Sequence, residues 1–227
     1  MKKSAILFLT FITFIVIIGG LGCTISYINE QDIIYIDPGH GGFDGGATSI
    51  DKNILEKNIV LDISIKLKYY LEQMGYKVLL TRDSDIALSN TKVEDIHKRV
   101  TLINNSRCLL YISIHANSYP NNNVKGAQTF YNPSKENNKY LSKYIMDELH
   151  NIDPYNKRVS KELKGKYLLD KTNKVGCLVE VGFLTNNQEV NLLVSDDYQE
   201  KIAYSIYLGI INYFSKSGEI YETYINN

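Results

Sequence analysis

The sequence alternates short apolar runs with longer segments whose apolar residues recur at helical spacing. This alternation constrains the fold more than any other feature, because strands and helices have different hydrophobic periods. The short runs predict strands at 32–36, 76–81, 108–116, 126–132, 166–170 and 176–183. The helical spacing predicts helices at 54–74, 93–106, 134–152 and 197–214. The sequence therefore predicts an α/β fold in a single domain, with a mostly parallel, twisted sheet and helices on both faces.

Two residues are expected to mark helix ends. Gly75 follows the helix 54–74, where glycine commonly ends a helix, and Ser134 is the expected N-cap of the helix 134–152. No internal repeat and no low-complexity linker divides the 227-residue chain. One domain with a sizeable core is therefore expected.

The first 29 residues have the pattern of a targeting segment. Lys2 and Lys3 precede the apolar stretch AILFLTFITFIVIIGGLG. A basic start before an apolar run is typical of a secretory signal peptide or an uncleaved N-terminal membrane anchor; a buried N-terminal helix is the alternative. We therefore expect export across the cytoplasmic membrane, membrane contact only through residues 1–29, and a folded domain over 30–227.

Charge and cysteine content exclude some classes of site. The 25 basic and 25 acidic side chains give a formal net charge of zero, so no strongly basic field favours nucleic-acid binding. Beyond Cys23, the cysteines are Cys108 and Cys177, each in an apolar, strand-like run. Buried free thiols are expected there, with a disulfide as the alternative, and no cysteine cluster indicates a structural zinc site.

The stretch YIDPGHGGFDGGA, at 35–47, places His40 among glycines directly after a predicted strand. Such a loop suits either a metal ligand or a phosphate cradle. The dinucleotide pattern G-x-G-x-x-G begins at Gly39, but Asp44 occupies its third glycine position and would repel a pyrophosphate. No GKS or GKT sequence is present for a P-loop. Phosphate binding is therefore disfavoured.

Four polar residues stand at strand ends or helix starts, where sites form in parallel sheets: His40, Glu56, His115 and Glu180. Singly, the first three have structural explanations as a loop histidine, a helix-start acid and a core histidine. Glu180 is harder to explain, because an unpaired carboxylate among apolar strand residues is costly. Two imidazoles and one carboxylate form the ligand set of an open catalytic zinc site, and Glu180 is then the candidate base. These residues are far apart in the sequence, so their spacing alone is weak support for a shared metal site.

Two arginines and an asparagine are weaker candidates for the site. Arg82 follows a predicted strand, and it either contacts a substrate carboxylate or pairs with Asp83 or Asp85. Arg99 and Asn104 lie on the helix before the His115 strand, where a structural pair or cap is expected.

Five short motifs together resemble those of the zinc-dependent N-acetylmuramoyl-L-alanine amidases of bacterial cell walls. The motifs are DPGHGGFDGGA, a glutamate opening the next helix, LLTRDSD, SIHAN and CLVEVGFLTN, and they span roughly residues 32 to 214. The resemblance implies zinc (Zn2+) ligands at His40, Glu56 and His115, with Glu180 as the catalytic glutamate. It also implies that 30–227 is the catalytic domain and that peptidoglycan is the substrate. Further candidates for contacts with the substrate or the ligands are Asp44, Arg82 and Asn117.

Departures from the family pattern concern the groove rather than the ligands. Val175 stands where relatives often have proline, and Asp170 where they often have arginine. A catalytic domain behind a leader, without a wall-binding repeat domain, resembles the spore-cortex, germination-specific type that makes muramic-δ-lactam. An accessory or activator protein is a further expectation, since no wall-binding domain holds the enzyme on its polymer.

Two other functions stay open. The first is a wall-binding module that has lost catalysis, although all four site residues are present. The second is a metallo-carboxypeptidase that trims stem peptides. It would need a carboxylate clamp, for which Arg82 and Arg158 are the suggestive candidates.

Overall fold

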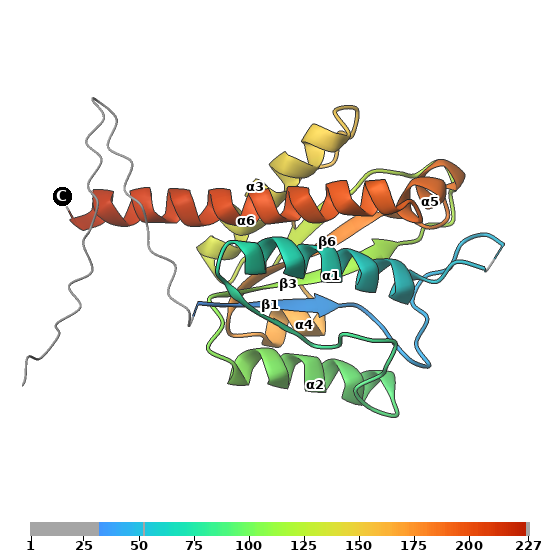
Figure 1. Cartoon of the computed structure of the whole chain (residues 1–227), viewed down its shortest axis with the longest axis horizontal. Coiled ribbons are helices and arrows are strands. Elements are labelled where there is room, and N and C mark those ends of the chain that lie inside the picture. The colour runs from blue at the N-terminus through green and yellow to red at the C-terminus, as the bar shows by residue number, and fades with distance from the viewer. Residues whose placement is uncertain (1–31, 52, 226–227) are drawn as a thin grey trace, which may run out of the picture.

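The computed structural model describes residues 32–51 and 53–225, and a six-stranded sheet forms its centre (Figure 1). The strands are β1 (Ile33–Pro38), β2 (Lys77–Leu80), β3 (Leu110–Asn117), β4 (Gln128–Tyr131), β5 (Lys161–Glu162) and β6 (Val175–Phe183). They lie in the order β2-β1-β3-β6-β4-β5, and every neighbouring pair is parallel except β4 and β6. The predicted mostly parallel sheet is thus confirmed.

Helices cover both faces of the sheet, as predicted (Figure 1). On one face lie α1 (Glu56–Gln73), α3 (Glu136–Ile152) and α6 (Asp196–Ile225). Helices α1 and α3 pack on the strands, and α6 packs on both of these helices. The other face carries α2 (Lys92–Asn105) and the short α4 (Tyr167–Lys171), while α5 (Asn187–Leu193) follows β6.

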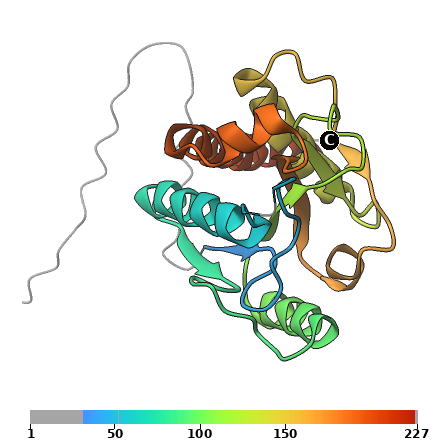
Figure 2. The ribbon, with the colours of Figure 1, turned by 90° about the vertical axis from the view of Figure 1, so that its right-hand side faces the viewer.

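The two faces bury cores of different size. The alternate strand residues Ile34, Ile112 and Val179 join the large core under α1, α3 and α6. Tyr35, Tyr111 and their neighbours form a smaller core under α2 and α4. Because strand side chains alternate between faces, the polar residues at the carboxyl ends of β1, β3 and β6 share the side of the smaller core. Figure 2 looks at this end of the sheet, where these strands stop and their loops begin.

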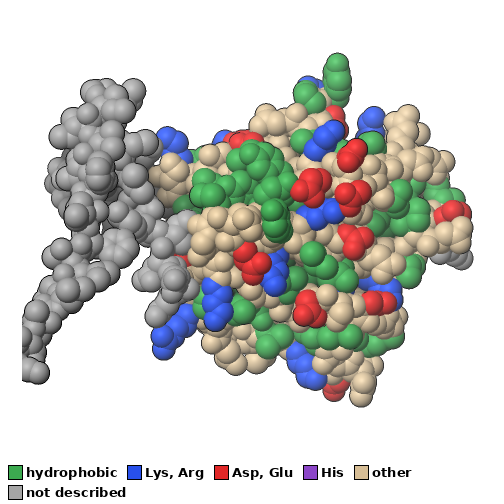
Figure 3. All heavy atoms as spheres, in the orientation of Figure 1, with side chains coloured by type: hydrophobic (Ala, Val, Ile, Leu, Met, Phe, Trp, Pro, Cys, Tyr) green, Lys and Arg blue, Asp and Glu red, His purple; other side chains and the backbone are tan. Residues whose placement is uncertain are grey.

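The described chain starts at the opposite end of the sheet, where α6 also ends (Figure 1). Residues 1–29, with the expected leader and Cys23, lie outside the described part. Among the helices of the described residues, none has the length and apolar character that a membrane span requires. Hydrophobic side chains gather over α1 and α6 on the face in Figure 3. Tyr70 of α1 is in ring contact with its neighbour Tyr69 and with Tyr204 of α6.

One predicted strand is wrong, because 166–170 begins a turn of helix, α4. Leu168 and Leu169 both join the smaller core, whereas consecutive residues of a strand would point to opposite faces of the sheet. The predicted N-cap is also wrong. Helix α3 starts at Glu136 after Lys135, and no side chain caps it, while the N–H of Ser134 donates to Asn132 Oδ1. The strand β5 and the helix α5 were not predicted.

The two described cysteines confirm the prediction of buried free thiols. Cys108 and Cys177 are unbridged and lie in different cores. Burial raises the pKa of both thiols, so they act as small apolar side chains.

Candidate metal centre

His40 lies in the loop after β1 and has a left-handed backbone, with φ of 60°. The preceding Gly39 donates its N–H to Ile114 O at 3.0 Å, which ties the loop to β3. Gly39 also leaves room for the His115 ring of β3, because a Cβ on it would lie only 2.3 Å from that ring. The glycines therefore let two distant histidines approach each other, and their ring centroids are 5.0 Å apart.

Glu56 is the first residue of α1, as predicted, and its buried carboxylate points back under the loop. Its Oε2 accepts from Ala47 N at 2.6 Å, and its Oε1 accepts from Ala116 N at 3.0 Å. A Cβ on Gly46, whose φ is +72°, would lie 2.5 Å from Oε2. The carboxylate is thus held by two backbone donors in a slot that only glycine leaves open.

The ligand atoms of His40, Glu56 and His115 all lie within 4.8 Å of one another. His115 Nδ1 is 2.8 Å from Glu56 Oε1, and His40 Nε2 is 3.1 Å from Glu56 Oε2. Burial alone would raise the pKa of Glu56, but hydrogen bonds from His115 and His40 hold it well below its usual range. Burial would lower the pKa of His115, yet the neighbouring Glu56 raises it. Two nitrogens and one anionic oxygen converge here, which fits a divalent metal.

Glu180 lies next to this cluster, because β3 and β6 pair it in register with His115. Its Oε2 is buried and has no hydrogen-bond partner among the described residues. Burial raises the pKa of Glu180 to about 7, with the charge of His115 opposing that rise. A buried carboxylate oxygen without a partner is costly, so this atom is suited to a group that the protein alone does not supply.

Asp44 faces the outer side of the His40 ring. Its Oδ2 lies 2.8 Å from His40 Nδ1, and its Oδ1 pairs with Lys92 Nζ at 2.7 Å. A carboxylate on Nδ1 favours the tautomer that carries its proton there, which leaves Nε2 free toward Glu56. Asp44 thereby fixes the orientation of the ring.

Arg82 was expected to contact a substrate carboxylate or to pair with Asp83 or Asp85, and the structure shows neither arrangement. It is almost fully buried, and its guanidinium donates to the carbonyl oxygens of Pro38, Gly39, Lys57 and Ser84, at 2.7 to 3.1 Å. Burial, with the nearby charge of Arg99, lowers the pKa of Arg82 to about 10. Neither Asp83 nor Asp85 pairs with it; Asp85 pairs with Lys57 instead. Arg82 thus secures the backbone just before His40 rather than facing a groove.

Arg99 supports the same loop from α2, in agreement with the expected structural pair. It bonds to Asp37 at 2.8 Å and to Asp95, and it donates to the carbonyls of Pro38 and His40. Burial would raise the pKa of Asp37, but Arg99 and hydrogen bonds from Thr81 and Ser113 hold it below its usual range. Asp37 was not predicted as part of the site, although an acid near the end of a buried apolar strand is a signal that the sequence contains.

Asn117 ends β3 at the irregular register between β3 and β6. Its side-chain oxygen accepts from Ser118 N at 2.8 Å. Asn104 is structural, as expected, and bonds to Lys171 O and Asn173 N.

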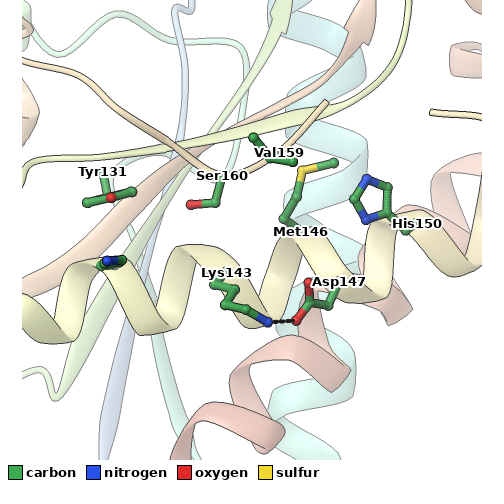
Figure 4. A pocket seen from close by; sticks show the side chains of 8 residues that line it. Tyr131, Lys143, Met146, Asp147, His150, Val159 and Ser160 are labelled. Atoms are coloured by element: carbon green, nitrogen blue, oxygen red, sulfur yellow. Dashed lines mark hydrogen bonds and ion pairs between the residues drawn. The ribbon is translucent and has the colours of Figure 1, made fainter. Parts of the chain in front are cut away.

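A separate pocket lies between α3 and the β4–β5 edge, and its lining includes Met146, His150 and Val159 (Figure 4). Its volume is about 230 Å³, and it contains none of the four clustered residues. This pocket is therefore separate from the candidate metal centre.

The chain matches the protein family described as N-acetylmuramoyl-L-alanine amidase over residues 34–212. It is 44% identical over 195 residues to the germination-specific N-acetylmuramoyl-L-alanine amidase of Bacillus subtilis (strain 168). That match covers 82% of this chain and 81% of the relative.

Solved structures share the fold. The CwlD amidase from Clostridioides difficile, in complex with the GerS lipoprotein, is 40% identical with a TM-score of 0.79. The match covers 81% of this chain and 98% of that one. The amidase AmiC2 of Nostoc punctiforme is 30% identical with a TM-score of 0.73, over 82% of this chain and 98% of that one.

Proposed function

Because this chain belongs to the N-acetylmuramoyl-L-alanine amidase family, we propose that it cleaves peptidoglycan with a zinc ion held by His40, Glu56 and His115. The enzyme hydrolyses the amide bond between N-acetylmuramic acid and the L-alanine of the stem peptide. The proposal rests on the convergence of three ligand atoms within 4.8 Å, beside an Oε2 of Glu180 that has no hydrogen-bond partner in the part of the chain that the structure describes.

The donor set fits zinc in an open catalytic site. Two imidazole nitrogens and one carboxylate oxygen leave a coordination position for water or substrate. Zinc in such a site activates water and polarises a carbonyl. Asp44 keeps Nε2 of His40 available for the metal, as a carboxylate behind a ligating imidazole does.

Glu180 is proposed as the general base. Its Oε2, which no described residue occupies, accepts a proton from the attacking water and passes it to the alanine nitrogen as the C–N bond breaks. The products are a free lactyl carboxyl group on the sugar and a peptide with a free N-terminal amine. A pKa near 7, raised by burial, suits a group that both takes and returns a proton.

Mass spectrometry of muropeptides tests the reaction. Purified peptidoglycan digested by the zinc-loaded chain should yield stem peptides that begin with unblocked L-alanine. Stem peptides shortened from their carboxyl ends would support the carboxypeptidase alternative, and intact material in a pull-down would support the binding module.

The substrate is proposed to be spore cortex. The germination-specific Bacillus subtilis relative supports this, since the match covers about four fifths of each chain. Amidase action frees the lactyl carboxyl that muramic-δ-lactam formation needs. Cortex from spores that lack this chain should therefore contain no muramic-δ-lactam, and normal lactam content would contradict the role.

Export and an accessory protein complete the proposal. The described chain begins at the end of the sheet opposite the metal centre, so an anchor there would leave the site accessible. The solved CwlD amidase is in complex with a lipoprotein, which supports a protein partner for this chain. The zinc-loaded chain assayed on intact cortex should gain activity from sporulating-cell extract. Full activity without extract would rule out the partner, and full-length protein found in the cytosol would rule out export.

A further inference from the structure

Arg158 is fixed in place by three contacts. Its Nε donates to Lys125 O at 2.8 Å, and its Nη1 donates to Gln128 Oε1 at 2.8 Å. Its guanidinium also lies over the ring of Phe183, 4.7 Å from the centroid. Phe183 is buried at the end of β6, so the guanidinium rests on a rigid apolar platform.

Gln128 connects Arg158 to the reactive end of the sheet. Gln128 on β4 and Glu180 on β6 are direct partners in an antiparallel pair. Directly opposed residues project to the same face, with Cβ atoms about 5 Å apart. Gln128 is in turn held by its own donation to Val159 O at 3.0 Å. The guanidinium is therefore positioned one side chain away from the proposed base, on the side away from His40.

The charge of Arg158 is not neutralised within the described part of the chain. No carboxylate there forms an ion pair with it. Arginine has five N–H donors, and the bonds to Lys125 O and Gln128 Oε1 use two of them, so three N–H donors, including both on Nη2, remain for a ligand. The surrounding segment 157–166, KRVSKELKGK, has five basic residues and one acid. The surface around Arg158 is therefore positively charged and suited to bind an anion.

The substrate has its free carboxylates on one side of the scissile bond. The lactyl carboxyl of the sugar is consumed in the amide, whereas the peptide ends in a free carboxylate. A guanidinium with two free N–H directions binds a carboxylate in fork geometry. We propose that Arg158, oriented by Gln128 and Phe183, binds a carboxylate of the stem peptide on the β4 side of Glu180. This assignment rests on the proposed amidase function, and it sets the direction in which peptide and glycan lie across the site.

The test compares two substrates and three proteins. The substrates are one N-acetylmuramoyl stem peptide with free carboxylates and the same molecule with all carboxylates amidated. The proteins are the zinc-loaded chain, Arg158→Met and the control Lys157→Met. Methionine retains an unbranched side chain over Phe183 but lacks charge, and Lys157 is an exposed neighbour of like charge. Zinc content and thermal unfolding, measured for all three, separate binding effects from a damaged fold.

We expect Arg158→Met to lower kcat/KM for the free-carboxylate substrate by roughly 10- to 100-fold, as expected for loss of a charged hydrogen bond. Its rate on the amidated substrate should match that of the unchanged chain, and Lys157→Met should leave both rates unaltered. Equal losses on both substrates, or no loss on either, would overturn the subsite while leaving the amidase function intact. An unchanged chain that cleaves neither substrate would overturn the amidase function itself.

Discussion

Gly46 contacts two of the three proposed metal ligands, so Gly46→Ala perturbs the centre without removing a ligand. A Cβ there would lie 2.5 Å from Glu56 Oε2 and 2.7 Å from His40 Cδ2. Ordinary contact begins at 3.4 Å, so the carboxylate has to retreat by about 0.9 Å. Zinc–ligand distances hold to within about 0.2 Å, so the displacement is several times larger than the centre tolerates.

The backbone adds a second cost. Gly46 has φ of +72°, and alanine in the left-handed region is destabilised by roughly 1–2 kcal/mol. We therefore expect Gly46→Ala to lower folding stability by that amount and zinc affinity by at least about 10- to 100-fold, the loss typical when the support of a ligand is disturbed.

Gly45→Ala is the matched control. Its Cβ would meet Leu55 Cδ2 at 3.4 Å, an ordinary contact, and no positive φ is involved. Zinc affinity is measured by chelator competition, and thermal unfolding of the metal-free proteins measures stability. Equal zinc affinity for the two variants would refute the geometry argued for this centre.

Three further outcomes are expected. Asp37→Asn should cost about 3–5 kcal/mol near pH 7 in urea unfolding, because it breaks a buried pair with Arg99. Since the folded pKa of Asp37 is depressed, its stabilisation is present above the unfolded value of about 3.9 and is lost as pH falls through the folded value. The unchanged chain should thus lose more stability below about pH 4 than the variant; parallel curves would contradict this. Glu189→Gln should cost about 1–3 kcal/mol, because one amide oxygen cannot accept from both Gly126 N and Phe183 N. A chelator should lower the melting temperature of the zinc-loaded chain, because zinc binds the folded state; an unchanged value would argue against a folded-state metal site.

The sequence was sufficient for most of the fold, because the long elements have clear periods. The helix that begins at Glu56 and the strands that end near His40 and His115 were predicted to within a few residues. Short elements were not predictable in this way. The run at 166–170 is apolar but too short for its period to distinguish helix from strand, and the two-residue β5 has no period at all.

For the candidate site, the residue types were sufficient to predict the four side chains that the fold brings together. The residues that hold these side chains in place were harder to predict. His40 and Asp44 are four residues apart, so their contact was within reach of local reasoning. Arg82 was not, because the carbonyls of Pro38 and Gly39 that it bonds to are more than 40 residues away and look like any other backbone. When the partners of a side chain are backbone atoms of a distant segment, the residue types in the sequence do not indicate the contact.

The most direct test of the central claim is Glu180→Gln, assayed for both metal and turnover. Glutamine keeps the shape of the side chain but cannot accept a proton. We expect zinc content equal to that of the unchanged chain and a loss of amide hydrolysis of at least about 10²–10⁴-fold. Near-normal turnover would contradict the role of Glu180 as the base, and loss of zinc would contradict its separation from the ligand set of His40, Glu56 and His115.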